Sequence, residues 1–500
     1  MLTRVTRKPV PIAAVLLLTL GGCAMFTPAS SDRAVPVLTP VMNHAEVPAT
    51  DAGDVDRFAP PLDGPFDLGT AIDFALKNNP EVVATGHDAE AARAREEESF
   101  GARLPSLMVE GGYTRYLDDQ RLVPARYNGE PGVFSDSIYA AGLVLRIPLF
   151  TGGRLVNEER ATSLLSQAAE HRLGRTREEL VFNVTSVFYH ILTQQKVLES
   201  LETSREALTS HLEHVNDLIA AQKATRVDRL RTEVRLADIQ QRIVAEQNVL
   251  AIQKRLLANL MGRTSIGEEV EMDGTLEETT ADRAPSRDEA IAAAFSDRSD
   301  YLAARKELDA QARRLDAARA AYAPTINLVG KYGWRWADDP TRQPSTTAPS
   351  GSRGTQTVAT EGATKAGDDS EDVGELGLSM DIPIFQGGQI TARVKGERAK
   401  LESARERLRR LELQIRLEVE SALLNLDSAA ERARTLRKAV EQAEESLREE
   451  RQKYDVGKGT IVDVLDAQSA LLEAQTNYYR ALADIRVARA QIDLATGARK

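Results

Sequence analysis

The 500-residue sequence predicts a mixed α/β membrane protein built as a tandem duplication, in which long coiled-coil helices alternate with membrane-crossing β-strands. Three observations predict this fold class. The motif RIPLFTGG at residues 146–153 returns as DIPIFQGG at residues 381–388. Alternating apolar and polar residues, which are typical of transmembrane strands, precede each motif. A long run without proline, which is typical of helix, follows each motif.

The composition favours long solvated helices over thick globular cores, because 28% of the residues are charged and 5% are aromatic. The net charge is −11, and no stripe of Lys and Arg is interleaved with aromatic residues, so a nucleic-acid partner is not expected. Beyond the N-terminal segment, no apolar run approaches the ~20 residues that a membrane-spanning helix needs. If the protein crosses a membrane, we therefore expect its strands rather than its helices to do so.

The N-terminus is typical of an exported protein. A basic start precedes an apolar run and two glycines, which predicts a signal peptide at residues 1–22. Cys23 is the only cysteine in the chain, so no disulfide framework explains it. Because LGGC at residues 20–23 resembles the bacterial lipobox, we expect Cys23 to be lipidated and anchored in outer-membrane lipid; the alternative is an incidental free cysteine. Residues 23–65, rich in Pro, Ala, Ser and Asp, are predicted to form a linker.

The duplication is visible as constant offsets between the two halves. Matching residues lie 235 positions apart from the first motif onward: Pro148 and Pro383, Asp228 and Asp463, Gly262 and Gly497. Upstream the offset is 219, as between Pro105 and Pro324, so the extra 16 residues lie in the polar low-complexity stretch before Pro383. We therefore expect a first repeat at residues 66–275 and a second repeat at residues 286–497.

Each repeat contains two predicted strands, at about residues 106–117 and 137–148 in the first and at about residues 325–336 and 374–383 in the second. In the last of these, Leu376, Leu378 and Met380 alternate with polar or small residues. This pattern is the signature of transmembrane β-barrels, although a half-buried soluble sheet also alternates. Four strands do not close a barrel and lipid does not tolerate an open sheet edge, so several chains must share one barrel.

The remainder is predicted to be helix of unusual length. In residues 153–221, apolar residues recur at alternating intervals of three and four, which marks a coiled-coil seam. Roughly 70 residues at ~1.5 Å each extend roughly 100 Å. The matching run covers residues 389–454; its segment LELQIRLEV at 411–419 alternates like a strand, but no turn signal bounds it, so we predict helix. Each long helix turns near Asp228 or Gly457 and returns as a shorter helix.

Two repeats of helix, two strands, long helix and return helix resemble the TolC-type outer-membrane efflux protein family. FDLGTAIDFALKNNPEV at residues 66–82 is similar to the opening motif of the family, and KYDVGKGTIVDVLDAQSALLEAQTNYYRALAD at residues 453–484 is similar to its closing motif. The resemblance implies a homotrimer in which four strands per chain form a shared twelve-stranded transmembrane β-barrel, continued by a trimeric α-barrel in the periplasm. It also implies that the strands end where the two barrels meet, at Pro148, Gly152, Gly153, Pro383, Gly387 and Gly388.

The resemblance further implies a passive exit duct in the outer membrane of a Gram-negative bacterium, without a cofactor. Its expected partners are a periplasmic adaptor protein and an inner-membrane pump, which supplies the energy. The cargo class stays open among small toxic molecules, metal ions and secreted polypeptides, because a water-filled tunnel has no substrate pocket that a sequence reveals.

The periplasmic gate of the family corresponds to the far helical turns. Asp463 and Asp466 match its acidic pair and lie three residues apart, which puts both carboxylates on one face of a helix. In a trimer they would form two rings of three carboxylates, which attract cations and repel each other. The alternative is that they are ordinary solvated charges near a helix start.

Other residues of the two turns are candidates for holding the gate closed. By the same resemblance, Tyr454 matches a linking tyrosine and Asp228 a carboxylate within its reach, while Arg231 occupies the repeat position of Asp466. The sequence departs from the family at Gly459, where some members carry a basic residue. It also departs at Gln222, which replaces the glycine of the first turn.

Two other classes of protein are less well supported. His211 and His214 form an i, i+3 pair, but no third ligand follows at a metal-site spacing and no catalytic motif is present, so we expect neither a metal site nor an enzyme. The second class is a structural periplasmic coiled-coil lipoprotein without a channel. Such a spacer has no use for apolar strands with aromatic ends, so the sequence favours the duct.

Overall fold

The computed structural model describes residues 66–122, 132–263, 272–276, 285–337, 341–343 and 371–498. They belong to one compact unit, Phe58–Lys500. The predicted signal peptide, Cys23 and the predicted linker lie outside the described residues.

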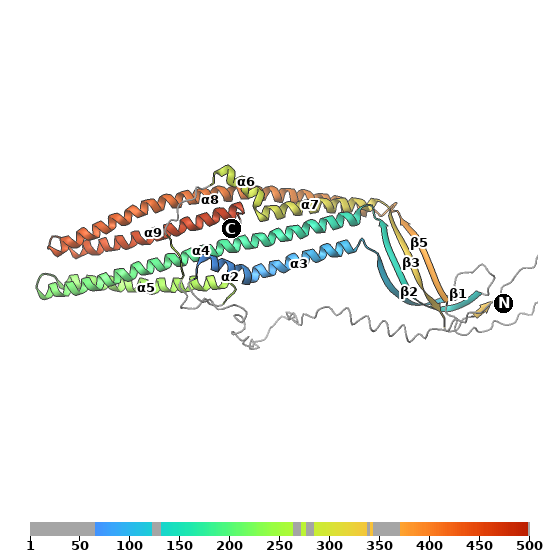
Figure 1. Ribbon diagram of the computed structural model, residues 1–500, viewed down its shortest axis with the longest axis horizontal. Coiled ribbons are helices and arrows are strands. Elements are labelled where there is room, and N and C mark those ends of the chain that lie inside the picture. Colours follow the sequence, from blue (N-terminus) through green and yellow to red (C-terminus); the bar gives the residue numbers. More distant parts are fainter. Residues whose placement is uncertain are drawn as a thin grey trace, which may run out of the picture. The chain divides into compact units, whose positions relative to one another are not determined.

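The two repeats share the order of two helices, two long strands, a long helix and a return helix, to which the second repeat adds a 3-10 turn and the short strand β4 (Figure 1). The first comprises α2 (Leu68–Asn78), α3 (Pro80–Gly101), β1 (Ser106–Arg121), β2 (Gly132–Phe150), α4 (Arg154–Ala220) and α5 (Arg226–Leu260). The second comprises α6 (Arg287–Asp297), α7 (Ser299–Arg319), a 3-10 turn (Ala320–Tyr322), β3 (Thr325–Trp336), β4 (Thr341–Gln343), β5 (Glu371–Asp381), α8 (Gln389–Asp455) and α9 (Ile461–Thr496). Residues 411–419 lie within α8, so the prediction of helix there is confirmed.

The strands form one antiparallel sheet in the order β1-β2-β3-β5, with the short β4 paired to β2. The described strands leave β1 and β5 at the two edges. One face is apolar and exposed in the single chain: Val109 is 76% exposed and Leu376 is 73% exposed. The opposite face carries charged residues, with Lys331 paired in register to Glu375. A sheet with one apolar face, one polar face and two open edges does not bury its apolar surface within a single chain.

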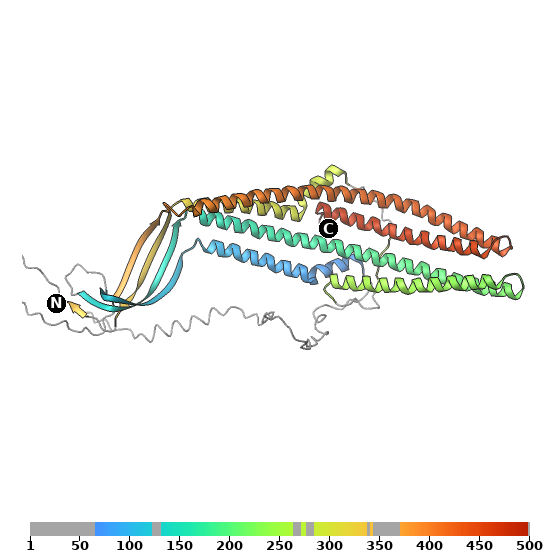
Figure 2. The same cartoon turned by 180° about the vertical axis from the view of Figure 1, so that it is seen from behind.

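Two glycines on neighbouring strands identify the concave face of the sheet. Gly142 and Gly333 are register partners, and their backbones approach so closely that a Cβ on Gly333 would lie 2.3 Å from the carbonyl oxygen of Ala141 and 2.5 Å from the Cα of Gly142. A face that leaves no room for a methyl group is the inside of a bend. Because side chains alternate along a strand, the charged residue Lys331 lies on this concave face and the apolar residues lie on the convex face. Figures 1 and 2 show the strands bending between their two ends.

Aromatic residues of the convex face gather in the middle of β1 and β2 and at the end of β3 that lies away from the helices. The rings of Tyr113 and Tyr139 are 4.7 Å apart, and those of Tyr139 and Trp336 are 5.7 Å apart. These three residues are aligned across β1, β2 and β3. Aromatic residues at the border of an apolar band are typical of a sheet that crosses a membrane interface.

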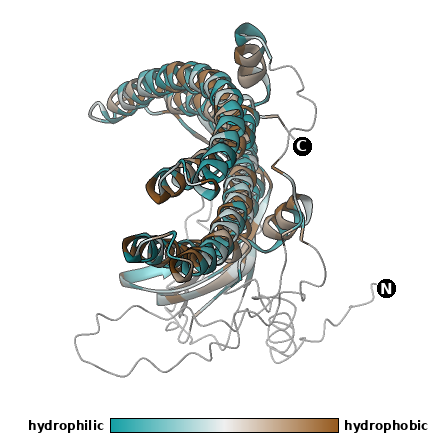
Figure 3. Ribbon diagram, turned by 90° about the vertical axis from the view of Figure 1, so that its left-hand side faces the viewer, coloured by the Kyte–Doolittle hydropathy of each residue, from teal (hydrophilic) through white to brown (hydrophobic). Residues whose placement is uncertain are grey.

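The helices stand side by side in a curved row, which Figure 3 shows from its end. Far from the sheet, α4 lies between α5 and α9, and α9 lies between α4 and α8; nearer the sheet, α3 and α7 take the places of α5 and α9. The short helices α2 and α6 pack on the convex side of the row. The main core lies where α2 meets α4 and α5, around Phe66 and Phe188. None of the described helices is both long enough and apolar enough to cross a membrane.

At the junction between strands and helices, one strand ends later than the sequence predicted. The strand β2 does not end at Pro148: Pro148 pairs with Asn327, the register shifts before Phe150, and the strand ends there. Proline lacks an N–H but is tolerated at such an irregularity. In the second repeat β5 ends at Asp381, two residues before Pro383. The proline therefore marks the junction in both repeats without being the last strand residue.

The paired glycines turn the chain from strand to helix in both repeats. Gly153 and Gly388 precede the first residues of α4 and α8 with φ angles of 84° and 80°, which residues with a side chain rarely adopt. A Cβ on Gly152 would also lie 2.4 Å from the Cβ of Ala323, whereas Gly387 has open space around it. Within a single chain, Gly152 is therefore closely packed and Gly387 is exposed.

Candidate gate at the helical tips

The two helical turns farthest from the sheet are built in the same way. Thr225 precedes α5 and Thr460 precedes α9, and in each turn the threonine hydroxyl and backbone N–H donate hydrogen bonds to the aspartate three residues later. These bonds measure 2.8 and 2.9 Å to Asp228, and 2.7 and 3.0 Å to Asp463. The bonds from Thr460 lower the pKa of Asp463 below its usual value.

The structure thus gives Asp228 and Asp463 a local role that the sequence interpretation missed. A capping box satisfies two of the free N–H groups at a helix start, and its T-x-x-D spacing was present in both turns. A carboxylate that accepts two hydrogen bonds from its own turn is oriented along that turn. Asp463 and Asp466 therefore do not form an equivalent pair, and Asp466 is the freer of the two.

Asp466 and Arg231 line one hollow of about 710 Å³ between α5 and α9. No ion pair joins either of them to another described residue, and both are exposed. A second set of charges in the hollow is already paired, because Asp238 accepts from Arg235 at 3.1 Å and lies 3.3 Å from Arg242. Arg231 of α5 and Asp466 of α9, which occupy equivalent positions in the two repeats, therefore share this hollow.

Tyr454 lies near Asp228, but no hydrogen bond links them in the described structure. Its side chain is half-buried at the end of α8, and its hydroxyl has no partner among the described residues. Burial, followed by the negative charges of Asp228 and Asp455, raises the pKa of Tyr454. The ring of His211 on α4 is 5.4 Å from the ring of Tyr454. The tyrosine therefore contacts a histidine that the sequence interpretation had weighed only as a metal ligand.

Gln222 and Gly459 are the two positions at which the turns depart from the family pattern, and both have unusual local geometry. Gln222 has a φ of 60° and is the single residue other than glycine with a positive φ among the described residues; Gly457 holds the equivalent place with a φ of 73°. A Cβ on Gly459 would lie 3.1 Å from the Cβ of Lys453 and 3.2 Å from the N of Tyr454. A larger residue at this position would therefore crowd the last turn of α8.

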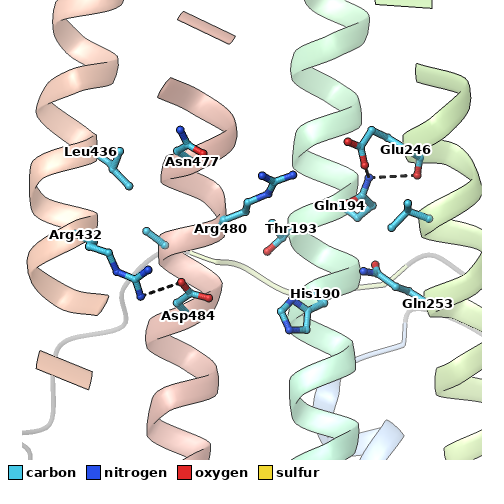
Figure 4. Close-up of a pocket in the computed structure, with 12 residues that line it drawn as sticks. His190, Thr193, Gln194, Glu246, Gln253, Arg432, Leu436, Asn477, Arg480 and Asp484 are labelled. Atoms are coloured by element: carbon cyan, nitrogen blue, oxygen red, sulfur yellow. Dashed lines mark hydrogen bonds and ion pairs between the residues drawn. The ribbon is translucent and has the colours of Figure 1, made fainter. Parts of the chain in front are cut away.

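A second hollow of about 740 Å³ is lined by residues of α4, α5, α8 and α9 (Figure 4). His190 and Thr193 line the hollow from α4, whereas Phe188 of the same helix packs in the core against α2. Because α2 lies on the convex side of the row, the hollow opens on the concave side. Its lining is polar: Arg432 pairs with Asp484 at 3.1 Å. Among the described residues, no group of three or more His, Cys, Asp or Glu side chains is arranged to hold a metal ion.

Comparison with known proteins agrees with this geometry. The profile of the family "Outer membrane efflux protein" matches residues 71–263 and 290–498, which are the two repeats. The chain is 24% identical to outer membrane protein TolC of Escherichia coli, over 85% of this chain and 80% of TolC. It is 27% identical to outer membrane protein OprJ of Pseudomonas aeruginosa, over 96% of this chain and 95% of OprJ.

Solved structures show the same fold. The outer membrane protein VceC of Vibrio cholerae matches with a TM-score of 0.69 at 17% identity, covering 86% of this chain and 96% of VceC. A structure of CusC, described with its transmembrane channel formation, matches with a TM-score of 0.69 at 18% identity and covers 86% of this chain and 92% of CusC. The chain therefore belongs to the outer membrane efflux protein family: it has the TolC-type channel fold and serves as an exit duct of the Gram-negative outer membrane for efflux or secretion.

Proposed function

We propose that this chain is the outer-membrane duct of a tripartite efflux or type I secretion system, and that it works as a homotrimer. The observation that carries the proposal is the four-stranded sheet with an apolar convex face and open edges at β1 and β5. Backbone groups at such edges find no partner in lipid, so copies must join edge to edge. Three copies give twelve strands, an even number within the range of outer-membrane barrels.

The names of relatives support the expected partners. One relative is the "Solvent efflux pump outer membrane protein SrpC" of Pseudomonas putida, 24% identical over 94% of this chain. Another is the "Proteases secretion protein PrtF" of Dickeya chrysanthemi, 22% identical over 81% of this chain. A passive outer-membrane duct takes its energy from elsewhere, so we propose a periplasmic adaptor and an inner-membrane pump as partners, with no cofactor and no enzyme activity of its own.

In the trimer, the concave side of each helical row faces the tunnel, and the helical tips form the periplasmic gate. Asp466 from three chains forms the acidic ring there, with Arg231 beside it, and Asp463 and Asp228 hold the turns in shape. The cation in the hollow makes the ring less negative than two rows of carboxylates would be.

Lipidation of Cys23 would anchor the N-terminus in the outer membrane, as the lipobox resemblance implies. Incorporation of labelled palmitate that is lost on Cys23→Ser checks this anchor; equal labelling of both proteins would rule it out. The other candidate, a structural lipoprotein without a channel, gains no support from the structure, because its strands would have no reason to expose residues such as Leu378, which is 68% exposed.

The duct is tested by the mass and the conductance of the purified protein. We expect the detergent-extracted protein to have the mass of three chains by light scattering after subtraction of the detergent, and to form ion channels in planar bilayers. A monodisperse monomer, or a trimer that conducts no ions under any condition, would refute the proposed function.

The same recordings test the gate residues. Asp466→Asn is expected to reduce block by trivalent cations applied at the periplasmic side, and Arg231→Gln is expected to strengthen that block, because the ring loses its compensating cations. Lys254→Gln is a matched control, since it removes a cation from α5 far from the turn. If Asp466→Asn and Arg231→Gln both leave the block unchanged, the selectivity lies elsewhere in the duct.

A further inference from the structure

One contact at the tips joins the two helical hairpins, α4–α5 and α8–α9, through polar residues. His211 and His214 extend from α4 toward Tyr454 and Asp455 at the end of α8. The Nε2 of His214 lies 3.8 Å from the Oδ1 of Asp455. The apolar cluster around Leu208 and Leu465 lies beside this contact, and Tyr454 packs against it.

Two polar atoms at this contact are buried without a partner. Neither the Nε2 of His211 nor the hydroxyl of Tyr454 has a hydrogen bond in the described structure, although the two rings are neighbours. An unpaired buried polar atom destabilises the contact, and a buried charge without a counter-ion does so far more. The arrangement therefore tolerates a neutral imidazole and disfavours an imidazolium.

The charges around His211 favour the same state. Burial is the main cause that lowers the pKa of His211, and His214 of its own helix and Arg451 of α8 lower it further, while Asp455 of α8 opposes them. From α5, Asp228 faces Tyr454 and its carboxylate is held by Thr225. From α9, Asp463 acts on Lys453 of α8. No carboxylate of these neighbours bonds to His211 in the described structure.

We propose that His211 is a proton-sensitive latch: as a neutral imidazole it allows the two hairpins to stay packed together at neutral pH, and its protonation releases them in acid. Protonation would put a charge between α4 and α8 beside Arg451, and separation of the tips would return that charge to water. Opening of the tips widens the periplasmic entrance of the duct. The inference rests on the proposed exit-duct function and adds a regulatory state to it.

The direction of the pH dependence follows from the two states. In the closed tip the pKa of His211 lies below the ordinary value of 6.5, which an opened and solvated imidazole would approach. The closed tip is thus fully favoured above about pH 6.5 and loses that advantage as the pH falls through the lowered pKa. Each unit of lowering corresponds to about a tenfold shift of the open–closed equilibrium per chain.

The test is the single-channel conductance of the full-length protein in planar bilayers at pH 7.5 and pH 5.5. We expect the wild type to spend several-fold more time in high-conductance states at pH 5.5. His211→Gln, which keeps a polar side chain but does not titrate, is expected to lose that increase. His87→Gln is the matched control, because His87 is an exposed histidine on α3, bonded to Glu90; it is expected to keep the increase.

A second variant separates the latch from its neighbour. His214 is exposed and lies 3.8 Å from Asp455, so it is not a buried group of the contact, and His214→Gln is expected to retain the acid response. Hydrogen exchange of the ends of α4 and α8 at the two pH values, corrected for chemical exchange, is expected to show loss of protection in acid in the wild type and in His87→Gln, but not in His211→Gln. The latch is overturned, and the duct left intact, if the acid response survives His211→Gln or if the wild type shows no acid response at all. Absence of channels at every pH would overturn the duct itself.

Discussion

Arg298→Met is expected to lower the free energy of unfolding by roughly 3 kcal/mol, at the lower end of the range for breaking a buried ion pair. Arg298 lies between α6 and α7 and its side chain is 2% exposed. It donates to Asp300 at 2.8 and 3.0 Å and lies 2.6 Å from an oxygen of Glu418 on α8. Methionine keeps the aliphatic stem but leaves both carboxylates without their cation.

The same substitution also removes a bond to the end of α9. The guanidinium of Arg298 donates to the carbonyl oxygen of Ala495 at 3.4 Å, and a second arginine, Arg175, donates to that of Leu494 at 3.2 Å. The expected value lies at the lower end of the range because Asp300 and Glu418 are partly exposed and retain some hydration. Urea unfolding of the detergent-extracted protein, followed by circular dichroism, measures the change.

The internal repeat supplies a matched comparison. Asn79, at the equivalent position, donates to the carbonyl oxygen of Leu260, the residue equivalent to Ala495, at 2.8 Å and caps α3. Asn79→Ala is expected to cost about 1–2 kcal/mol, the loss of a cap and one hydrogen bond without a stranded charge. An Arg298→Met protein as stable as the wild type would show that the buried network adds nothing over an apolar contact, which is a known outcome for some ion pairs.

Gly333→Val is expected to abolish the folded sheet, and with it insertion into the outer membrane. The added Cβ would lie 2.3 Å from the carbonyl oxygen of Ala141 and 2.5 Å from Gly142, both backbone atoms of the neighbouring strand. Relief of this overlap requires β2 and β3 to separate in the middle of the sheet, where their ladder runs from Tyr139 to Phe150. The amount of protein in the outer-membrane fraction and its resistance to added protease measure the loss.

A valine elsewhere on the same face provides the control. Gly377 lies on β5 and pairs with Val329, and a Cβ there meets nothing within 4 Å. Gly377→Val raises β propensity without overlap, so it is expected to insert at wild-type levels. If Gly333→Val inserts equally well, then the close approach of β2 and β3 is not required for the membrane form.

Much of the fold could be predicted because it depends on periodicities that a single sequence displays. The long helices, including residues 411–419, follow from long runs without proline or a turn signal, and the strand pairs follow from alternation. The strand β2 runs two residues past its predicted end at about Pro148, because a register irregularity accommodates the proline. Strand ends depend on pairing with a distant segment, which the sequence does not display.

The gate was harder to predict for two physical reasons. The spacing predicts that Asp463 and Asp466 share one helix face, but the local bond from Thr460 to Asp463 competes with any longer-range role, and only the geometry reveals that bond. The contact of His211 with Tyr454 joins residues 243 positions apart in the sequence, so no local spacing reveals it. Arg298 was missed because arginine is rarely buried, and its partner Glu418 lies on another helix.

The break between the two short helices of each repeat is fastened to the return helix by different chemistry in the two halves of the chain. In the first half the break between α2 and α3 is tied to the end of α5 by a neutral amide, beside Pro80, which fixes the backbone. In the second half the same joint has become ionic and also reaches α8 through Glu418. The two repeats thus differ at this position: the first is fastened by a hydrogen bond between uncharged groups, and the second by ion pairs. Divergence between paralogous ducts is therefore expected to concentrate in how the α8–α9 hairpin is fastened, while the α4–α5 hairpin keeps its neutral joint.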